Sequence, residues 1–212
     1  MKHLVILGSA LILGACASAN LQVRQPDASV RPNYTKELSR PKDQVWNDAV
    51  AALGQRFFVI NNLDKSSGFI NISYSGDPAR YVDCGAFTVT ITGPNAKTQT
   101  IDGAAVDARY ETVAPMPPYG VPTRVQVRRQ ISLEGRVNLI FEATGPDKTR
   151  VTTATRYVLT RKISMSNMVG QHTDTASFNG NEKGQFPQLG TNQATECVAT
   201  GELEKSVLSV IR

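Results

Sequence analysis

Apolar and polar side chains alternate along residues 125–159. A period of two predicts strands with one buried face, and the polar residues 144–148 between the two runs predict a turn. Directly opposed residues share a face, so odd positions must pair with odd positions, which requires a loop of three or five residues. The apolar odd positions are Val125, Val127, Ile131, Leu133, Val137, Leu139, Phe141, Val151, Tyr157 and Leu159.

Shorter segments repeat this period and predict strands at residues 57–60, 70–74, 87–92 and 106–113. Four prolines lie within residues 114–122, which excludes a central strand there and predicts an exposed loop or bend. Residues 164–196 are mostly polar. For them we expect either irregular structure held by a bridge from Cys197 or a weak strand near residues 176–178.

Two segments have helical spacing instead. After Pro41, the apolar residues recur so as to form one face, which predicts a helix over residues 41–53 with Trp46 as a core anchor. A second helix is predicted over residues 202–211, with Thr200 as its cap and Glu204 outside its apolar face. The order helix, strands, helix predicts an α+β fold. We expect an antiparallel sheet of about six strands, covered on one face by the two helices in a helix-grip-like arrangement with a filled core.

The first sixteen residues have the layout of a secretory signal. A basic start is followed by ten mostly aliphatic residues, which are too few to span a bilayer. Leu13, Gly14 and Ala15 then precede Cys16, and this order resembles the lipobox of bacterial lipoproteins. The alternative is an ordinary signal peptide that is cleaved after a nearby alanine.

The lipobox resemblance implies a signal peptide at residues 1–15 and acylation of the Cys16 thiol, for example with palmitate. Several acyl chains hold a protein stably on a bilayer. Because Ala17 and not Asp follows Cys16, the resemblance implies that this bilayer is the outer membrane, with the protein facing the periplasm. The partner of the acylated Cys16 would therefore be outer-membrane lipid. Residues 16–38 are polar and are expected to form a flexible tether, and residues 39–212 a single periplasmic domain.

Cys84 and Cys197 remain after Cys16 is assigned to lipid. In an oxidising compartment two cysteines are most simply paired as a disulfide. A metal site or a catalytic thiol is the alternative, but His172 is the one histidine beyond the signal and lies in a polar tract. We therefore expect a disulfide, no metal site and no cofactor.

Basic residues line the polar face of the long strands. The chain of 212 residues has a formal net charge of +5. An anion-binding face is one interpretation of this row, and a solvated face that discourages edge pairing is the other. Arg129 differs because it takes an apolar position, and full burial of its side chain would require a carboxylate partner. The row consists of Arg124, Arg128, Arg136, Arg150 and Arg156.

Residues 39–74 also resemble the helix-grip domains of BamC-type lipoproteins, which belong to the machinery that assembles outer-membrane β-barrels. The resemblance consists of residue types at 39–41, Val45 and Trp46, Leu53, residues 58–60 and residues 68–70. It implies a helix-grip fold and a place in an envelope assembly. The whole chain is similar to uncharacterised lipoproteins of proteobacteria, a likeness that implies no activity.

Three functions follow from these features. The first is a non-catalytic accessory or scaffold subunit of an envelope assembly or secretion complex, with an envelope protein as partner. The second is a module that binds a lipid, and the third binds an anionic envelope polymer through the basic face. Enzymatic activity has the least support, since phosphate loops, nucleophile elbows and metal-ligand motifs are missing from the sequence. Nucleic acid is not an expected partner in the periplasm, despite a pI near 9.2.

Overall fold

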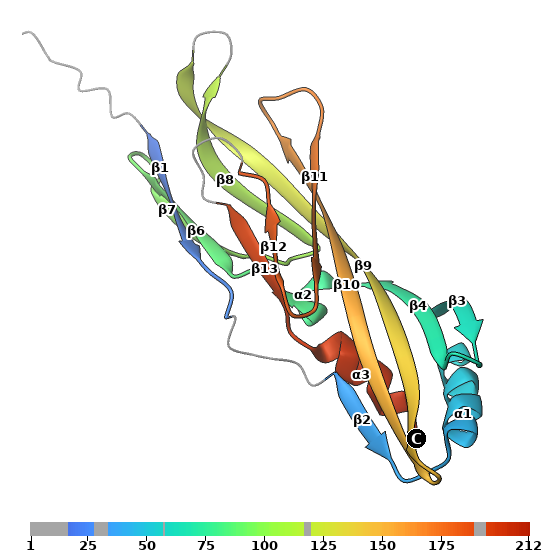
Figure 1. Cartoon of the computed structure of the whole chain (residues 1–212). Coiled ribbons are helices and arrows are strands. Elements are labelled where there is room, and N and C mark those ends of the chain that lie inside the picture. The colour runs from blue at the N-terminus through green and yellow to red at the C-terminus, as the bar shows by residue number, and fades with distance from the viewer. Residues whose placement is uncertain (1–16, 28–33, 57, 117–119, 189–193) are drawn as a thin grey trace, which may run out of the picture.

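The computed structural model describes residues 17–27, 34–56, 58–116, 120–188 and 194–212. Within these ranges the chain is mostly β (Figure 1). The helices are α1 (Lys42–Gly54), α2 (Pro78–Tyr81) and α3 (Glu202–Val210). The strands are β1 (Ser18–Arg24), β2 (Thr35–Leu38), β3 (Val59–Asp64), β4 (Phe69–Gly76), β5 (Val82–Asp83), β6 (Ala86–Thr92), β7 (Lys97–Asp102), β8 (Asp107–Met116), β9 (Val121–Gly145), β10 (Lys148–Met165), β11 (His172–Asn179), β12 (Lys183–Phe186) and β13 (Thr195–Ala199).

The long hairpin of β9 and β10 forms the spine of the molecule. Its odd positions are buried from Val125 to Phe141 and from Thr149 to Ile163, and they pair with odd positions, as Leu139 does with Thr153, which confirms the alternation. The predicted loop of three or five residues is wrong, because only Pro146 and Asp147 lie between the strands. A register shift at Lys148/Thr149 restores the odd pairing instead, so a bulge supplies the extra residue.

Different strands flank the two halves of this hairpin in the seven-stranded sheet. Near the hairpin turn, β2 pairs with β10, and β4 and β3 extend the sheet beyond β9. In the other half, β11 pairs with β10 and β8 with β9. Two three-stranded sheets, β1-β6-β7 and β12-β13-β5, complete the fold (Figure 1).

The prediction of a six-stranded sheet covered by two helices is wrong. Strands make up 61% of the structure and helices 14%, and they form one seven-stranded sheet with two smaller sheets. Helices α1 and α3 do pack their predicted apolar residues into the main core, but this core covers only part of the long hairpin. Val89, Ile91 and Ile101 of the sheet β1-β6-β7 form a second core, which Tyr110 of β8 contacts.

Two further expectations need correction. Part of the expected tether, Ser18–Arg24, is strand β1 and pairs along its whole length with β6. Glu204, expected outside the apolar face of its helix, is fully buried. Of the two alternatives for residues 164–196, the described part shows the strand, because it contains β11 and β12, and β11 includes the weak strand expected near residues 176–178.

The disulfide between Cys84 and Cys197 is present, as the cysteine count predicts. Both cysteines are buried in the main core, Cys84 directly after β5 and Cys197 within β13. The bridge therefore joins two neighbouring strands of a small sheet that are 113 residues apart in the chain. None of the helices within the described ranges has the length and apolar character needed to cross a membrane.

Asp64 shapes the turn between β3 and β4. Its carboxylate accepts hydrogen bonds from the hydroxyl and backbone N–H groups of Ser66 and Ser67, which lower the pKa of Asp64 to about 2. A lowered folded-state pKa gives stability that is present above about pH 4 and is lost as the pH falls towards 2. Asp64→Asn is expected to make the urea midpoint less steeply dependent on pH in this acid range. An unchanged slope would contradict this role.

Candidate functional site

The five arginines of the predicted basic face do not act as one row. Arg128 forms a two-point ion pair with Asp107, and Arg150 pairs with Glu37 at 2.6 Å. Arg124 donates to the backbone carbonyls of Pro94 and Asn95 in the loop between β6 and β7. These three guanidinium groups are therefore occupied by neighbours on the protein.

Arg136 and Arg156 are the exceptions, because they lie directly opposite each other on β9 and β10. Two like charges at opposed positions repel each other. Among the described residues, neither guanidinium has a carboxylate within 4.0 Å. Arg156 donates a hydrogen bond of 3.1 Å to the Ser177 hydroxyl. The pair thus forms a concentrated positive charge on the exposed face.

Amide side chains adjoin this pair. Asn71 on β4 is opposite Asn138 on β9, and its amide donates to the Asn138 side-chain oxygen at 2.6 Å. Asn61 on β3 donates in turn to the Asn71 oxygen at 2.8 Å. On the other side, Asn179 on β11 is opposite Arg156. Hydrogen-bonding groups therefore extend across the sheet from β3 to β11.

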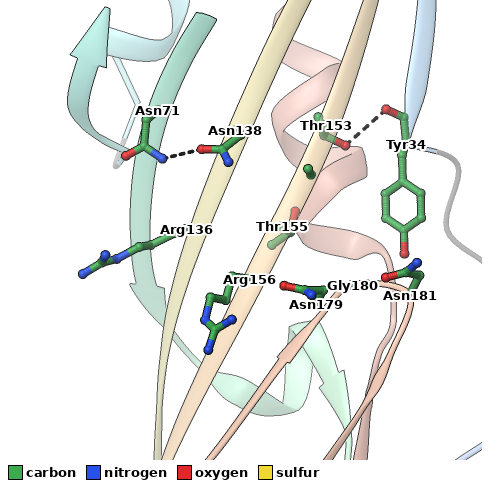
Figure 2. A pocket seen from close by; sticks show the side chains of 11 residues that line it. Tyr34, Asn71, Arg136, Asn138, Thr153, Thr155, Arg156, Asn179, Gly180 and Asn181 are labelled. Atoms are coloured by element: carbon green, nitrogen blue, oxygen red, sulfur yellow. Dashed lines mark hydrogen bonds between the residues drawn. The ribbon is translucent and has the colours of Figure 1, made fainter.

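The arginine pair and the amides line a groove, defined here as two adjoining hollows that share Asn71 and Arg136. One hollow has a volume of about 510 Å³ and reaches the turn after β11, and the other, of about 460 Å³, extends over β4 and includes Glu134. Figure 2 shows the side chains of the first hollow arranged across β4, β9 and β10. The groove lies on the face opposite the helices, because even positions of β9 point away from the core.

Tyr34 and Gly180 close one end of the groove at a gap in the sheet. Between the ends of β2 and β11, the Thr153 N–H donates to the Tyr34 carbonyl at 2.7 Å, and the Gly180 N–H donates to the Thr155 carbonyl at 2.9 Å. The Tyr34 hydroxyl is buried without a hydrogen-bond partner. Burial and the nearby Glu204 carboxylate raise the pKa of Tyr34 to about 12. This hydroxyl therefore stays protonated at neutral pH and can act as a donor.

Glu204 lies beneath this gap, beside Gly180, and the Tyr157 hydroxyl is its hydrogen-bond donor. The Tyr157 hydroxyl contacts both carboxylate oxygens of Glu204 at 2.9 Å, and burial together with Glu204 raises the pKa of Tyr157. We expect Tyr157→Phe to lower the free energy of unfolding by about 1–3 kcal/mol, because it leaves a buried carboxylate without this donor. Urea unfolding measures the loss.

A second substitution is the control for this prediction. Adding Glu204→Leu to Tyr157→Phe removes both polar partners, so most of the lost stability should return. A double variant as unstable as the sum of the two single variants would contradict the coupling.

The predicted lipobox residues are not among the described residues that line this groove. Leu13, Gly14, Ala15 and Cys16 lie outside the described residues. Within the described part of the chain, no three His, Cys, Asp or Glu side chains lie close enough together to hold a metal ion. Sequence reasoning placed Arg136 and Arg156 on one face but missed the amides of β3, β4 and β11, whose positions depend on how the strands pair.

Comparisons with protein-family models, with curated proteins and with solved structures found no match to this chain.

Proposed function

We propose that this chain is a non-catalytic, lipid-anchored envelope protein whose groove binds an acidic segment of an envelope polysaccharide. The paired guanidinium groups of Arg136 and Arg156, without a carboxylate partner among the described residues, are the observation that carries the proposal. An acidic ligand would relieve the repulsion between them and form charge-assisted hydrogen bonds with both.

The remaining side chains of the groove favour a sugar over an acyl chain. Asn71, Asn138, Asn179 and Asn181 supply amide donors and acceptors that match hydroxyl groups. These side-chain amides neither gain nor lose a proton at neutral pH, so they suit the binding of a ligand rather than acid–base catalysis. The two adjoining hollows offer an extended site, as a polymer segment requires.

Titration of the purified protein with oligomers of alginate and, separately, with uncharged dextran oligomers of the same length tests the proposal. Alginate supplies one carboxylate per sugar. We expect it to bind with an affinity that weakens as the salt concentration rises, because exposed charges are screened, and we expect dextran to bind much more weakly. Equal affinities for the two polymers, or no binding of alginate, would contradict the proposal.

The proposed anchor is the acylated thiol of Cys16. Strand β1 begins at Ser18, so an anchor at Cys16 would hold the first residue of β1 within about 10 Å of the bilayer surface, given about 3.5 Å for each extended residue. Cys16→Ser is expected to abolish incorporation of radiolabelled palmitate. Palmitate labelling that persists in this variant would place the anchor elsewhere.

Exposed apolar side chains favour a second candidate function, that of an accessory or scaffold subunit of an envelope complex. Met116 and Val121 at the tip of β8–β9 and Met168 and Val169 at the tip of β10–β11 are exposed. The two tips adjoin, because Asn167 donates to the Pro115 carbonyl, and they lie at the end of the molecule farthest from α1 (Figure 1). Exposed apolar groups of this kind mark protein-binding surfaces.

A crosslinking experiment in the native cell tests this second function. We expect a reproducible envelope protein partner to be captured by the unmodified chain and lost with Val121→Ser and Val169→Ser together. Capture that is unchanged by these substitutions would contradict a role for the tips.

A further inference from the structure

Arg129 is a buried cation on the opposite face of β9 from the groove. Its side chain is 2% exposed, in place of the apolar residue that its position predicts. One terminal nitrogen, Nη2, donates to the Gly103 carbonyl at 2.7 Å, and the guanidinium lies 5.5 Å from the centre of the Phe87 ring. The other nitrogen, Nη1, is buried without a hydrogen-bond partner.

The carboxylate partner expected for a buried Arg129 is not found among the described residues, so that sequence-based prediction is wrong. Burial and the neighbouring charge of Arg161 lower the pKa of Arg129 to about 10. Burying a cation without a counter-ion is costly. The protein nevertheless keeps this charge in a place where an apolar side chain would pack.

Arg161 provides the contrast within the same region. It is 5% exposed, but its Nε and Nη2 groups donate to the two carboxylate oxygens of Asp174, and Nη2 also donates to the Pro187 carbonyl. The charge of Arg161 is therefore neutralised by the protein itself. Arg129, a second cation beside it, has no ion pair of this kind among the described residues and is attracted only from a greater distance by the Asp102 and Asp174 carboxylates.

A cleft of about 110 Å³ opens onto these two arginines. It lies between the small sheet β1-β6-β7 and the strands β8, β9 and β10, and most of its lining is apolar. Its volume is somewhat below that of an engineered apolar cavity of about 150 Å³ that binds benzene. The apolar side chains that matter most here are Leu21, Val23, Phe87, Val127, Ile163 and Met165.

We propose that this cleft is a binding site for a small aliphatic carboxylate, whose acid group pairs with Arg129 and whose tail occupies the apolar lining. The unpartnered Nη1 supplies a donor for one carboxylate oxygen, and the ligand supplies the missing counter-ion. Scaled from the cavity of about 150 Å³ that binds benzene, a cleft of about 110 Å³ holds a tail of about four or five carbons. The site is separate from the groove, because odd and even positions of β9 face opposite sides of the sheet.

Titration of the chain that carries Cys16→Ser and lacks residues 1–15, the apolar signal expected from the sequence, tests the proposal with hexanoate and 1-hexanol. The two probes share a tail and differ in the acid group. We expect hexanoate to bind about tenfold tighter or more, because only the carboxylate forms a charged hydrogen bond with Arg129. Affinity should rise from acetate to hexanoate and then level off. Equal binding of hexanoate and 1-hexanol, or no binding of hexanoate, would overturn the proposal.

Arg129→Met and Arg128→Met form a matched pair of variants. Arg128 is the adjacent residue but points to the opposite face, where it pairs with Asp107. We expect Arg129→Met to abolish the preference for hexanoate and to keep or raise the thermal midpoint of the free protein, since an unpaired buried charge is removed. Arg128→Met should keep the preference. A preference for hexanoate that survives Arg129→Met would overturn the proposal. If that variant does not fold, the relative affinities of hexanoate and 1-hexanol for the protein with Arg129 in place decide whether the proposal holds.

Discussion

Replacing Arg136 and Arg156 by glutamate together is expected to weaken binding of alginate oligomers by about a hundredfold or more. Each charged hydrogen bond contributes about 1.5–3 kcal/mol, so the loss of two accounts for this factor before any repulsion between the new carboxylates and the ligand is counted. Both side chains are on the solvated face and have no ion-pair partner among the described residues, so the fold should be retained. Isothermal titration calorimetry measures the affinity.

Lys148→Glu with Lys162→Glu is the matched control for this double substitution. Both lysines are exposed and lie on β10, the strand that carries Arg156, and the change in net charge is the same. Neither residue lines the groove. We expect the control to retain most of the affinity, because distant surface charges are largely screened. A similar loss in both double variants would indicate attraction by net charge alone and contradict a defined site.

Removing the disulfide is expected to have the largest effect on stability. Cys84 and Cys197 are 113 residues apart in the chain, and the chain-entropy relation gives a loss of about 4–5 kcal/mol when a bridge of this span is removed. Both cysteine side chains are buried in the main core, next to the two residue pairs that join β5 to β13. Cys84→Ser with Cys197→Ala, or reduction of the native protein, should lower the urea midpoint accordingly.

Comparison of the single and double variants separates the bridge from the side chains. If the disulfide stabilises the fold, either single variant under oxidising conditions should lose nearly as much stability as the double variant, because each single substitution already breaks the bond. A double variant within about 1 kcal/mol of the unmodified chain would contradict the expected contribution, since that is the size of an ordinary substitution.

The part of the fold that sequence predicts is the part with regular apolar alternation. Val137, Leu139 and Val151 fixed the face and pairing of β9 and β10, and the spacing of Val45, Ala49 and Leu53 located α1. The pairing of β9 with β10 can be predicted from the local pattern alone, because burial of one face of each strand selects the register.

Strand β12, and β11 outside the weak strand expected near residues 176–178, show why the rest of the fold could not be predicted. In β12 one of the two buried positions is Gly184, which gives no apolar signal. It is glycine because the Phe178 ring fills the space where a Cβ would stand. In β11 only Ala176 and Phe178 are buried among polar neighbours. Tertiary packing, rather than local pattern, decides these strands.

Only part of the candidate site could be predicted from the sequence. The parity of β9 and β10 placed Arg136 and Arg156 on the solvated face, but the same parity also included Arg128 and Arg150, whose acids come from β8 and β2. The order of strands in the sheet decides which arginines find a carboxylate. The same order brings the Asn61, Asn71 and Asn138 amides together, from three different strands.

Nuclear magnetic resonance of the labelled protein during titration with alginate oligomers tests the central claim most directly. The side-chain amide signals of Asn71, Asn138 and Asn179 and the Nε signals of Arg136 and Arg156 should shift together and saturate at one concentration of ligand. The Arg129 Nε signal should stay unchanged, since it faces the other side of β9. Shifts confined to the tips or to the β1-β6-β7 sheet, with the groove signals unmoved, would contradict the account.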